Sequence, residues 1–439
     1  QIMNIHLSHE TIAAIVTPLG EGGIGKIVVS GPKALNMVND IFEGKHIKDL
    51  CNAESGKLYY GHIVSGNQRI DEVILNIEKQ GSSFTGEDVV EINCHGGIRI
   101  LMRVYELIVS HGAKKETWEG LSAQALENDQ IDAIQKEALP ELVAARTKLC
   151  AKVLLDQYNG ALSKTIHECL DITKQMECAS AEGHNTDEKV IFPLKELTHS
   201  IDTLLNTAPF GMALISPQTI VILGKPNVGK STLMNAVLGE EQMIVHHEPG
   251  TTRDYASEYI SIEDIPFEIV DTAGIRKTED TVESMSIEMT REQLGRADKV
   301  LAIFDNSKPL DHEDREILDA LKSWKMAKAY ERQRACTIIP LINKTDLPAQ
   351  LDTKIIESEI ASPVYYISAQ KKEGLDVVYE KLVGEFNTCY HPGTPVVFNK
   401  RQFHLLSGAR RMLEATAFSA AARQELRNIF KECLRGAIY

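Results

Sequence analysis

Residues 224–231 read Gly-Lys-Pro-Asn-Val-Gly-Lys-Ser, a spacing that matches the phosphate-binding loop G-x-x-x-x-G-K-S. An apolar, strand-like run at 219–223 precedes the motif and a helix-like stretch at 232–238 follows it, as the motif requires. Lys230 would reach the β- and γ-phosphates, and the Ser231 hydroxyl would ligate Mg²⁺. We therefore predict a nucleotide site, with contacts from Asn227, Val228, Gly229, Lys230, Ser231 and Thr232.

Two further motifs indicate a magnesium site and contacts to the γ-phosphate. Asp271-Thr-Ala-Gly274 follows the apolar run 267–270, so Asp271 would hold Mg²⁺ through water and Gly274 would offer its backbone N–H to the γ-phosphate. Upstream, Thr251 and Thr252 belong to a candidate switch loop, and Thr252 would close on Mg²⁺ when the γ-phosphate is present.

Two later motifs would select the base. Residues 343–346 (Asn-Lys-Thr-Asp) follow a strand-like run, and the carboxylate of Asp346 would accept N1–H and a 2-amino hydrogen of guanine, a pair that adenine lacks. Residues 368–370 (Ser-Ala-Gln) would place a backbone N–H near guanine O6. The order and the strand context of these motifs predict GTP rather than ATP. The expected contacts here are Asn343, Lys344, Asp346, Ser368 and Ala369.

Hydrolysis needs a helper, because Ile275 stands where many small GTPases have a water-positioning Gln. Asn227 offers a side-chain oxygen at phosphate level that suits a monovalent cation, which would neutralise developing charge beside Lys230. Glu283 would polarise water directly or through a second water. Its alternative interpretation is a solvated first-turn glutamate before a helix at 285–296.

The bulk composition is that of a multidomain globular protein. The chain has 439 residues, 43% hydrophobic residues and a net charge of −15, which speaks against a protein that coats nucleic acid. Its eight cysteines form no C-x-x-C pair, which fits a reducing cytoplasm. We expect no membrane span and no secretory signal, because apolar runs are short and the N-terminus lacks a basic region.

The fold class expected is multidomain, α/β plus all-α. Mixed strand and helix patterns predict an N-terminal α/β domain at 1–120, and helical spacing predicts a helical domain beginning at 121–212. Strand and helix then alternate through 213–378, which predicts a P-loop GTPase domain with a doubly wound, mostly parallel sheet. The helical pattern resumes at 379–439, so the GTPase domain is inserted into the helical domain.

The tail 401–439 carries a local charge of +4, from seven Lys and Arg residues against three Glu residues. Either an RNA contact or a solvated helix face explains this balance, and the second is favoured.

Several motifs together resemble the tRNA-modification GTPase family MnmE (also TrmE). They are the loop 224–231, Pro-Gly-Thr-Thr-Arg-Asp at 249–254, Asp-Thr-Ala-Gly-Ile-Arg at 271–276 with Val282-Glu283, and Phe-Thr-Gly-Glu-Asp-Val-Val-Glu-Ile-Asn-Cys-His-Gly-Gly at 84–97. The resemblance covers nearly the whole chain. It implies dimerisation through the N-terminal domain, potassium-stimulated GTP hydrolysis, and a flavoprotein partner, MnmG (GidA), with which an aminomethyl-type group is placed on C5 of the tRNA wobble uridine.

The resemblance also implies particular site residues. Asn227 matches the potassium-ligating asparagine and Glu283 the general-base glutamate, and the potassium loop matches His246, Glu248 and Thr251. The expected ligands are therefore GTP or GDP, Mg²⁺ and K⁺.

The chain departs from the family in its one-carbon folate pocket. The family arginine after the Gly22–Gly25 turn is Val28, and the family lysine and arginine further on are Gln130 and Gln124, while Glu91 is kept. The C-terminal Cys-x-Gly-Lys is absent, and Cys433 is either its remnant or a buried helical thiol. These losses predict weak binding of 5-formyltetrahydrofolate. Lys26 would replace the arginine if the strand register shifted by two residues, which keeps it on the same face.

Two functions remain open at this point. The chain is either an MnmE-type enzyme of tRNA modification, or a divergent paralogue that keeps the GTPase switch and serves as a regulatory or assembly module. The altered folate pocket favours the second, whereas residues 84–97 and the GTPase motifs fit both. A ribosome-assembly GTPase would leave residues 1–120 unexplained.

Overall fold

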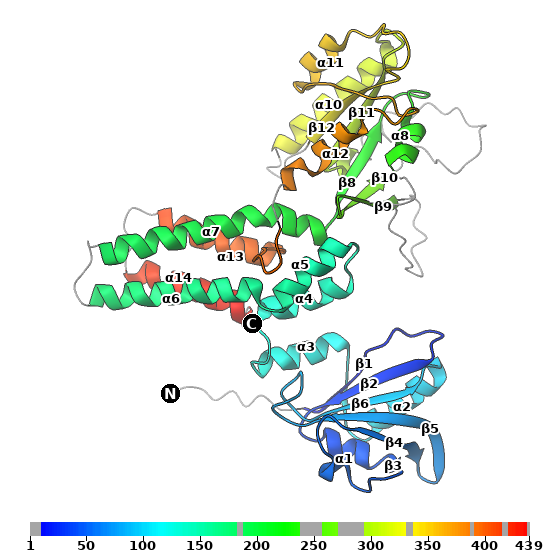
Figure 1. The fold of residues 1–439 in the computed structure, drawn as a ribbon, viewed down its shortest axis with the longest axis vertical. Helices are drawn as coiled ribbons and strands as arrows, with labels where there is room; N and C mark the ends of the chain where they lie inside the picture. Colours follow the sequence, from blue (N-terminus) through cyan, green and yellow to red (C-terminus); the bar gives the residue numbers. More distant parts are fainter. Residues whose placement is uncertain are drawn as a thin grey trace. The chain divides into compact units, whose positions relative to one another are not determined.

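The computed structural model describes residues 10–181, 188–237, 257–270, 294–330, 337–386, 390–414 and 420–436 (Figure 1). The chain divides into two compact units, residues 1–140 with 431–439, and residues 141–430. Several residues with predicted roles lie outside the described ranges: His246, Glu248, Thr251, Thr252, Asp271, Gly274, Ile275 and Glu283.

The first unit is built on a seven-stranded sheet with the order β3-β4-β5-β6-β2-β1-β7. Neighbouring strands are antiparallel except β1 and β7, which run parallel. The strands are β1 (Ile12–Ile15), β2 (Ile24–Ser30), β3 (Phe42–Gly44), β4 (Leu58–Ser65), β5 (Gln68–Glu78), β6 (Val89–His95) and β7 (Lys114–Glu116).

The two faces of this sheet bury different sets of side chains, because successive residues of a strand point to opposite sides. Ala13 of β1 belongs to the larger core with α1 (Ala34–Asn39) and α2 (Ile98–Ser110). Its neighbours Ile12 and Ala14 pack with Val28 and Leu121, the latter on α3 (Trp118–Glu127). The α3 side of the sheet therefore carries Val28 and, paired with it on β6, Glu91, two of the residues that the sequence places in the folate-like pocket.

The second unit contains a group of helices. Four lie wholly within it: α5 (Lys148–Tyr158), α6 (Ala161–Ala181), α7 (Glu188–Ile215) and α13 (Lys400–Glu414). Two more are shared with the first unit: α4 (Ala133–Val143) enters this unit after residue 140, and α14 (Ala420–Arg435) leaves it after residue 430. Helix α7 packs against both α6 and α13. In the described ranges, no helix combines the length and the apolar character that a membrane span needs.

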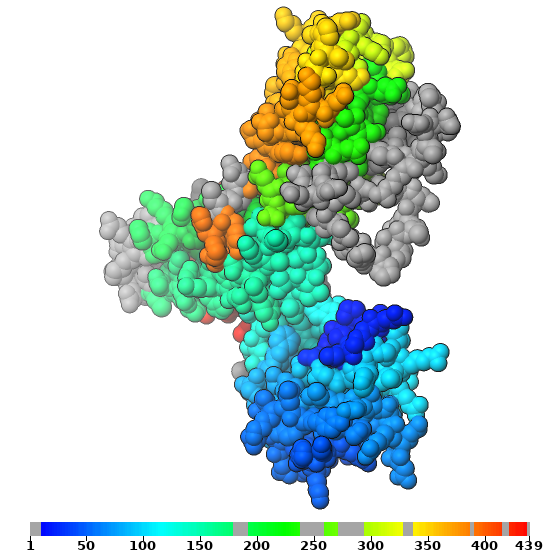
Figure 2. All heavy atoms as spheres, turned by 45° about the vertical axis from the view of Figure 1, so that its right-hand side comes forward, coloured from blue at the N-terminus to red at the C-terminus, as the bar shows by residue number. Residues whose placement is uncertain are grey.

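After the inserted domain, the chain returns to the helices through residues 390–398, which lie on them in Figure 2 (orange on green). The side chain of Gln157, on α5, is fully buried there. It donates to Val153 O and Thr394 O at 3.0 and 3.1 Å and accepts from Val396 N at 3.0 Å. Val397 N donates to Thr207 Oγ1 on α7 at 3.0 Å. Side chains of two helices thus satisfy the backbone of a segment that has no regular structure.

The inserted domain has a six-stranded sheet with the order β13-β12-β11-β8-β10-β9. All neighbours are parallel except β9, which pairs antiparallel with β10 at the edge. The strands are β8 (Gln218–Leu223), β9 (Ser257–Ile262), β10 (Ile265–Val270), β11 (Lys299–Asp305), β12 (Thr337–Asn343) and β13 (Tyr365–Tyr366). The helices whose bounds lie within the described residues are α8 (Lys230–Val237), α10 (His312–Tyr330), α11 (Thr353–Ile360) and α12 (Leu375–Val383), followed by a 3₁₀ turn at Gly384–Phe386.

This architecture confirms the predicted fold class, an N-terminal sheet domain, helices and an inserted domain with a mostly parallel sheet. Strand β9 was not predicted. It is a short hairpin partner of β10 joined by Glu263 and Asp264, both with positive φ, and its Ser-Glu-Tyr-Ile-Ser-Ile sequence has little apolar signal. The division into four domains at 120, 212 and 378 stays a prediction.

Candidate guanine-nucleotide site

The phosphate-binding loop joins β8 to α8 and needs glycine at two positions. A Cβ on Gly224 would lie 2.7 Å from Ile303 O of β11. Gly229 has φ +103°, and a Cβ there would lie 2.3 Å from Asn343 Nδ2. Both glycines therefore permit a close approach between the loop and neighbouring strands that no other residue type allows.

Lys230 and Ser231 open helix α8 directly after the loop. Lys230 Nζ donates to Gly224 O at 2.8 Å and to Lys225 O at 2.9 Å, so its ammonium lies across the loop. Ser231 and Thr232 are exposed in the first turn of α8, whereas Val228 is buried. This is the placement that a polyphosphate at a helix N-terminus requires.

Asn343 connects three of the predicted motifs. Its side chain is 2% exposed, and its Nδ2 donates to Val228 O at 2.8 Å. Its Oδ1 accepts from Ala369 N at 3.0 Å. Both ends of the amide are thus bonded within the protein, and Asn343 holds the phosphate-binding loop to the segment that follows β13.

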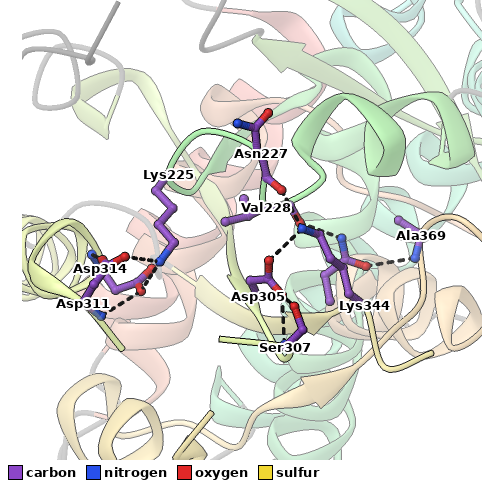
Figure 3. A network of polar contacts seen from close by, with 10 residues as sticks. Lys225, Asn227, Val228, Asp305, Ser307, Asp311, Asp314, Lys344 and Ala369 are labelled. Carbon is purple, nitrogen blue, oxygen red and sulfur yellow. Dashed lines mark hydrogen bonds and ion pairs between the residues drawn. The ribbon is translucent and has the colours of Figure 1, made fainter. Parts of the chain in front are cut away.

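Lys344 extends this connection to β11. Its Nζ donates to Asn227 O at 2.7 Å and to the carboxylate of Asp305 at 2.6 Å (Figure 3). Asp305 is buried at the carboxyl end of β11, where Ser307 donates to it through both its backbone N–H and its hydroxyl. The lysine of the Asn-Lys-Thr-Asp motif is therefore fixed between a carboxylate and the loop.

The surroundings of Asp346 favour its ionised carboxylate, which is a hydrogen-bond acceptor. Ser368 Oγ donates to its Oδ1 at 2.8 Å. This hydrogen bond, with the nearby positive charges of Lys371 and Lys344, lowers the pKa of Asp346 below its ordinary value. An ionised carboxylate at this position can accept the N1–H and 2-amino hydrogens of guanine.

Of the predicted cation ligands, the described residues include only Ser231 and Asn227. Asn227 is exposed and has φ +62°, a left-handed conformation that asparagine tolerates better than most residues. Within the described ranges, no group of three or more His, Cys, Asp and Glu side chains is placed to hold a metal ion. The residues that hold Mg²⁺, and the K⁺ site as a whole, therefore stay predictions.

Four residues of this network were not singled out from the sequence: Lys225, Asp305, Asp311 and Asp314. Lys225 occupies a variable position of the loop motif, and the three aspartates follow or end a strand as many solvated aspartates do. Only the burial of Lys225, at 8% exposure, shows that its charge is paired inside the protein.

A second candidate site lies on the α3 side of the sheet in the first unit. It is a cavity of about 260 Å³ whose lining includes Val28 and Glu91 but not Gln130. The lining residues are Val16, Lys26, Val28, Glu78, Phe84, Thr85, Val89, Glu91 and Leu121. Gln130 donates to Asn128 O instead.

Lys26 reaches this cavity without any register shift. Val28 pairs directly with Glu91 across β2 and β6, and Lys26, two residues earlier, points to the same face. Its Nζ lies 2.9 Å from Glu91 Oε2, which also accepts from Asn76 Nδ2 at 3.2 Å. The lysine proposed as a substitute for the family arginine therefore neutralises Glu91.

The basic tail and Cys433 have local roles in the structure. Arg410 pairs with Asp202 at 2.5 Å, and Arg427 pairs with Glu177 at 3.1 Å. These contacts agree with a helix surface stabilised within the protein. Cys433 is 1% exposed on α14, as a buried helical thiol would be.

Two protein-family models match the chain. The family described as "GTP-binding protein TrmE N-terminus" matches residues 11–129, and the family described as "50S ribosome-binding GTPase" matches residues 219–344.

Curated relatives match over most of their length. A "tRNA modification GTPase MnmE" of Lactiplantibacillus plantarum is 37% identical and the match covers 94% of this chain and 89% of the relative. Proteins with the same name from Alkaliphilus metalliredigens (39% identical, 85% and 81% covered) and Bacillus subtilis (35% identical, 92% and 89% covered) agree. The assembled guanine-nucleotide motifs and these matches show that the chain is a GTP-hydrolysing enzyme that belongs to the tRNA modification GTPase MnmE family.

Proposed function

We propose that this GTPase acts in the modification of tRNA, at C5 of the wobble uridine, together with an MnmG-like flavoprotein. The observation that carries the proposal is the match to proteins named tRNA modification GTPase over about nine-tenths of both chains, which includes the N-terminal unit as well as the GTPase domain. A cytoplasmic homodimer, paired through the N-terminal domain, is part of the proposal, and tRNA contact is direct or passes through the partner.

Complementation tests this function. The gene is expressed in a bacterial strain that lacks the family enzyme, and the wobble uridines of its tRNA are measured by mass spectrometry. We expect the modified nucleoside to return with the wild-type chain and to be absent with Lys230→Ala, which removes the phosphate-binding ammonium. Unmodified uridine in a strain that contains soluble, GTP-hydrolysing protein would contradict the proposal.

We further propose that K⁺ stimulates hydrolysis through Asn227 and that Glu283 polarises the attacking water. Support comes from Asn227, whose backbone carbonyl is held by Lys344 while its side chain is exposed within the phosphate-binding loop. We expect GTP turnover at least tenfold faster in K⁺ than in Na⁺, a difference lost in Asn227→Ala and kept in Asn235→Ala, an exposed asparagine of α8. Equal rates in the two salts would remove the role of Asn227. Glu283→Gln should slow hydrolysis and leave GTP binding intact.

The cavity in the first unit favours the alternative function, a GTP-dependent regulatory or assembly module without the folate-dependent chemistry. Its lining has one ammonium, already paired with Glu91, and a second carboxylate on Glu78. A folate brings carboxylates of its own, so this lining does not fit it. We predict little heat of binding when 5-formyltetrahydrofolate is titrated into the protein. Val28→Arg restores a cation and should strengthen binding, and tight binding to the wild type would show the pocket to be competent.

A further inference from the structure

Lys225, the second residue of the phosphate-binding loop, has its ammonium inside the protein. The side chain is 8% exposed, and its Nζ lies 2.6 Å from Asp311 Oδ2 and 2.7 Å from Asp314 Oδ2 (Figure 3). Burying an ammonium is unfavourable unless partners compensate for the lost water. The loop is therefore tied to the two aspartates by a contact that does not involve nucleotide.

The two aspartates form a rigid acceptor at the start of α10. Asp314 N donates to Asp311 Oδ1 at 3.1 Å, and Asp311 N donates to Asp314 Oδ2 at 3.3 Å. Carboxylates in the first turn of a helix are also stabilised by the helix dipole. The position of the acceptor is thus set by the backbone of α10, a 19-residue helix packed on the sheet by Leu318, Leu321 and Trp324.

Lys225 and Asp311 are charged at neutral pH, whereas burial raises the pKa of Asp314 against the hydrogen bond from Lys225. Burial by itself would lower the pKa of Lys225, but the hydrogen bonds to Asp311 and Asp314 outweigh it and raise the pKa. Burial likewise opposes ionisation of Asp311, and the hydrogen bond from Lys225 overcomes it and lowers the pKa. Among the described residues, Asp314 Oδ1 has no hydrogen-bond partner, so the Lys225 ammonium and the Asp311 N–H, both on Oδ2, are the donors to this buried carboxyl.

The bonds of Lys225 to Asp311 and Asp314 form one anchor of the loop, and Lys344 with Asp305 forms a second anchor that is also a lysine–aspartate pair. Asn227 lies between the two. Its carbonyl is bound by Lys344, which is held by Asp305, and Lys225 precedes it by two residues. Its φ of +62° is uncommon for a residue other than glycine and persists only where surrounding contacts determine it. Both anchors end on one segment, residues 305–314, which connects β11 to α10.

We propose that Lys225 is a positioning residue of the GTPase site. Its bonds to Asp311 and Asp314 hold the loop in the shape that receives the phosphates, so that little ordering remains when nucleotide binds. Hydrogen-bond donors that are already in position before nucleotide binds contribute more to affinity, and stabilise developing charge better, than donors that must first be ordered. The role concerns GTP binding and hydrolysis, and it depends on neither the tRNA substrate nor the potassium site.

The test compares Lys225→Met with Lys225→Arg. The measurements are the dissociation rate of fluorescent GDP, KM and kcat for GTP, and the Tm without nucleotide. We expect Lys225→Met to release GDP at least tenfold faster and to raise KM, and Lys225→Arg, which keeps a cation, to stay within about threefold of the wild type. Lys308→Met removes an exposed lysine of the same connection and should change nothing. In Lys225→Met, GDP release within twofold of the wild-type rate overturns the proposal.

Two further variants separate positioning from general stability. Leu318→Ala weakens the packing of α10 without touching the anchor. If its GDP release accelerates as much as that of Lys225→Met at equal loss of Tm, the role of Lys225 is structural only. Asp311→Asn replaces one charged acceptor of the anchor with a neutral amide, at a side chain that is 53% exposed, and it is the variant to use where Lys225→Met does not fold. We expect a several-fold faster release from it, and an unchanged rate overturns the proposal.

Discussion

Asn343 illustrates how single residues act in this protein. The sequence placed it among the nucleotide contacts, and in the structure its amide joins Val228 of the phosphate-binding loop to Ala369. A buried amide with both ends bonded gives a fixed distance between the phosphate and base regions of the site. Its neighbour Lys344 acts in the same way through Asp305. Residues of a binding motif thus contribute by holding one another as well as by contacting ligand.

A prediction about a single residue concerns the protonation of His95, at the end of β6. Its ring Nδ1 lies 2.6 Å from Asp71 Oδ1, and the hydrogen bond to this buried carboxylate raises the pKa of His95 above its ordinary value. Because the pKa is higher in the folded state than in the unfolded state, the resulting stabilisation is complete below the unfolded pKa. It is lost as the pH rises through the folded pKa.

Titration of the His95 ring by NMR checks this expectation. Asp71→Asn should lower the pKa of His95, while the resonances of the other histidines keep their titration curves. An unchanged His95 curve in the variant would mean that Asp71 does not control its protonation.

At the scale of elements, helix α7 is in contact with several other parts of the second unit. It packs on α6 and α13, and its residue Gly211 allows the returning segment to approach closely. A Cβ on Gly211 would lie 2.2 Å from Val397 O. The side chains of Gln157 on α5 and Thr207 on α7 form hydrogen bonds with the backbone of the same segment, which hold the chain where it returns to the helices.

Gly211→Ala should therefore lower the free energy of unfolding by about 1–3 kcal/mol, because the added methyl must displace backbone. Gly408→Ala, in the middle of α13, is the matched substitution: its Cβ would meet nothing closer than 3.9 Å. It should raise the free energy of unfolding by about 0.5–1 kcal/mol, since alanine loses less backbone entropy. Urea unfolding measures both changes. Equal effects of the two substitutions would contradict the close approach at Gly211.

At the scale of the whole molecule, the chain forms two compact units, and the helices of 141–430 share one of them with the GTPase domain. Nucleotide binds to the folded state of that unit only. A ligand that binds only the native state stabilises it by about 2.7 kcal/mol at a hundred times its Kd.

Calorimetry should therefore show two unfolding transitions, of which Mg²⁺·GDP raises one. Limited proteolysis identifies the transition that moves, and we expect it to belong to residues 141–430. A nucleotide-induced rise of both transitions by the same amount would show that the units unfold together.

Strands and helices with strong patterns were predictable from the sequence. The run 219–223 lies within β8, and the helix-like stretch expected from residue 232 lies in α8, which begins at Lys230. Strand β9 was not predicted, because pairing with β10 stabilises this edge strand more than the strand propensity of its own residues does.

By itself, the sequence determined the family, the GTPase chemistry and the order of motifs along the chain, because local spacing decides which groups can surround a phosphate and a guanine base. Only the tertiary structure decided how those motifs are held. The ammonium of Lys225 meets carboxylates 86 and 89 residues away, and Lys26 meets Glu91 across two strands. Pairing of buried charges depends on distances that the folded sheet creates, and these distances are not encoded in the spacing of any motif.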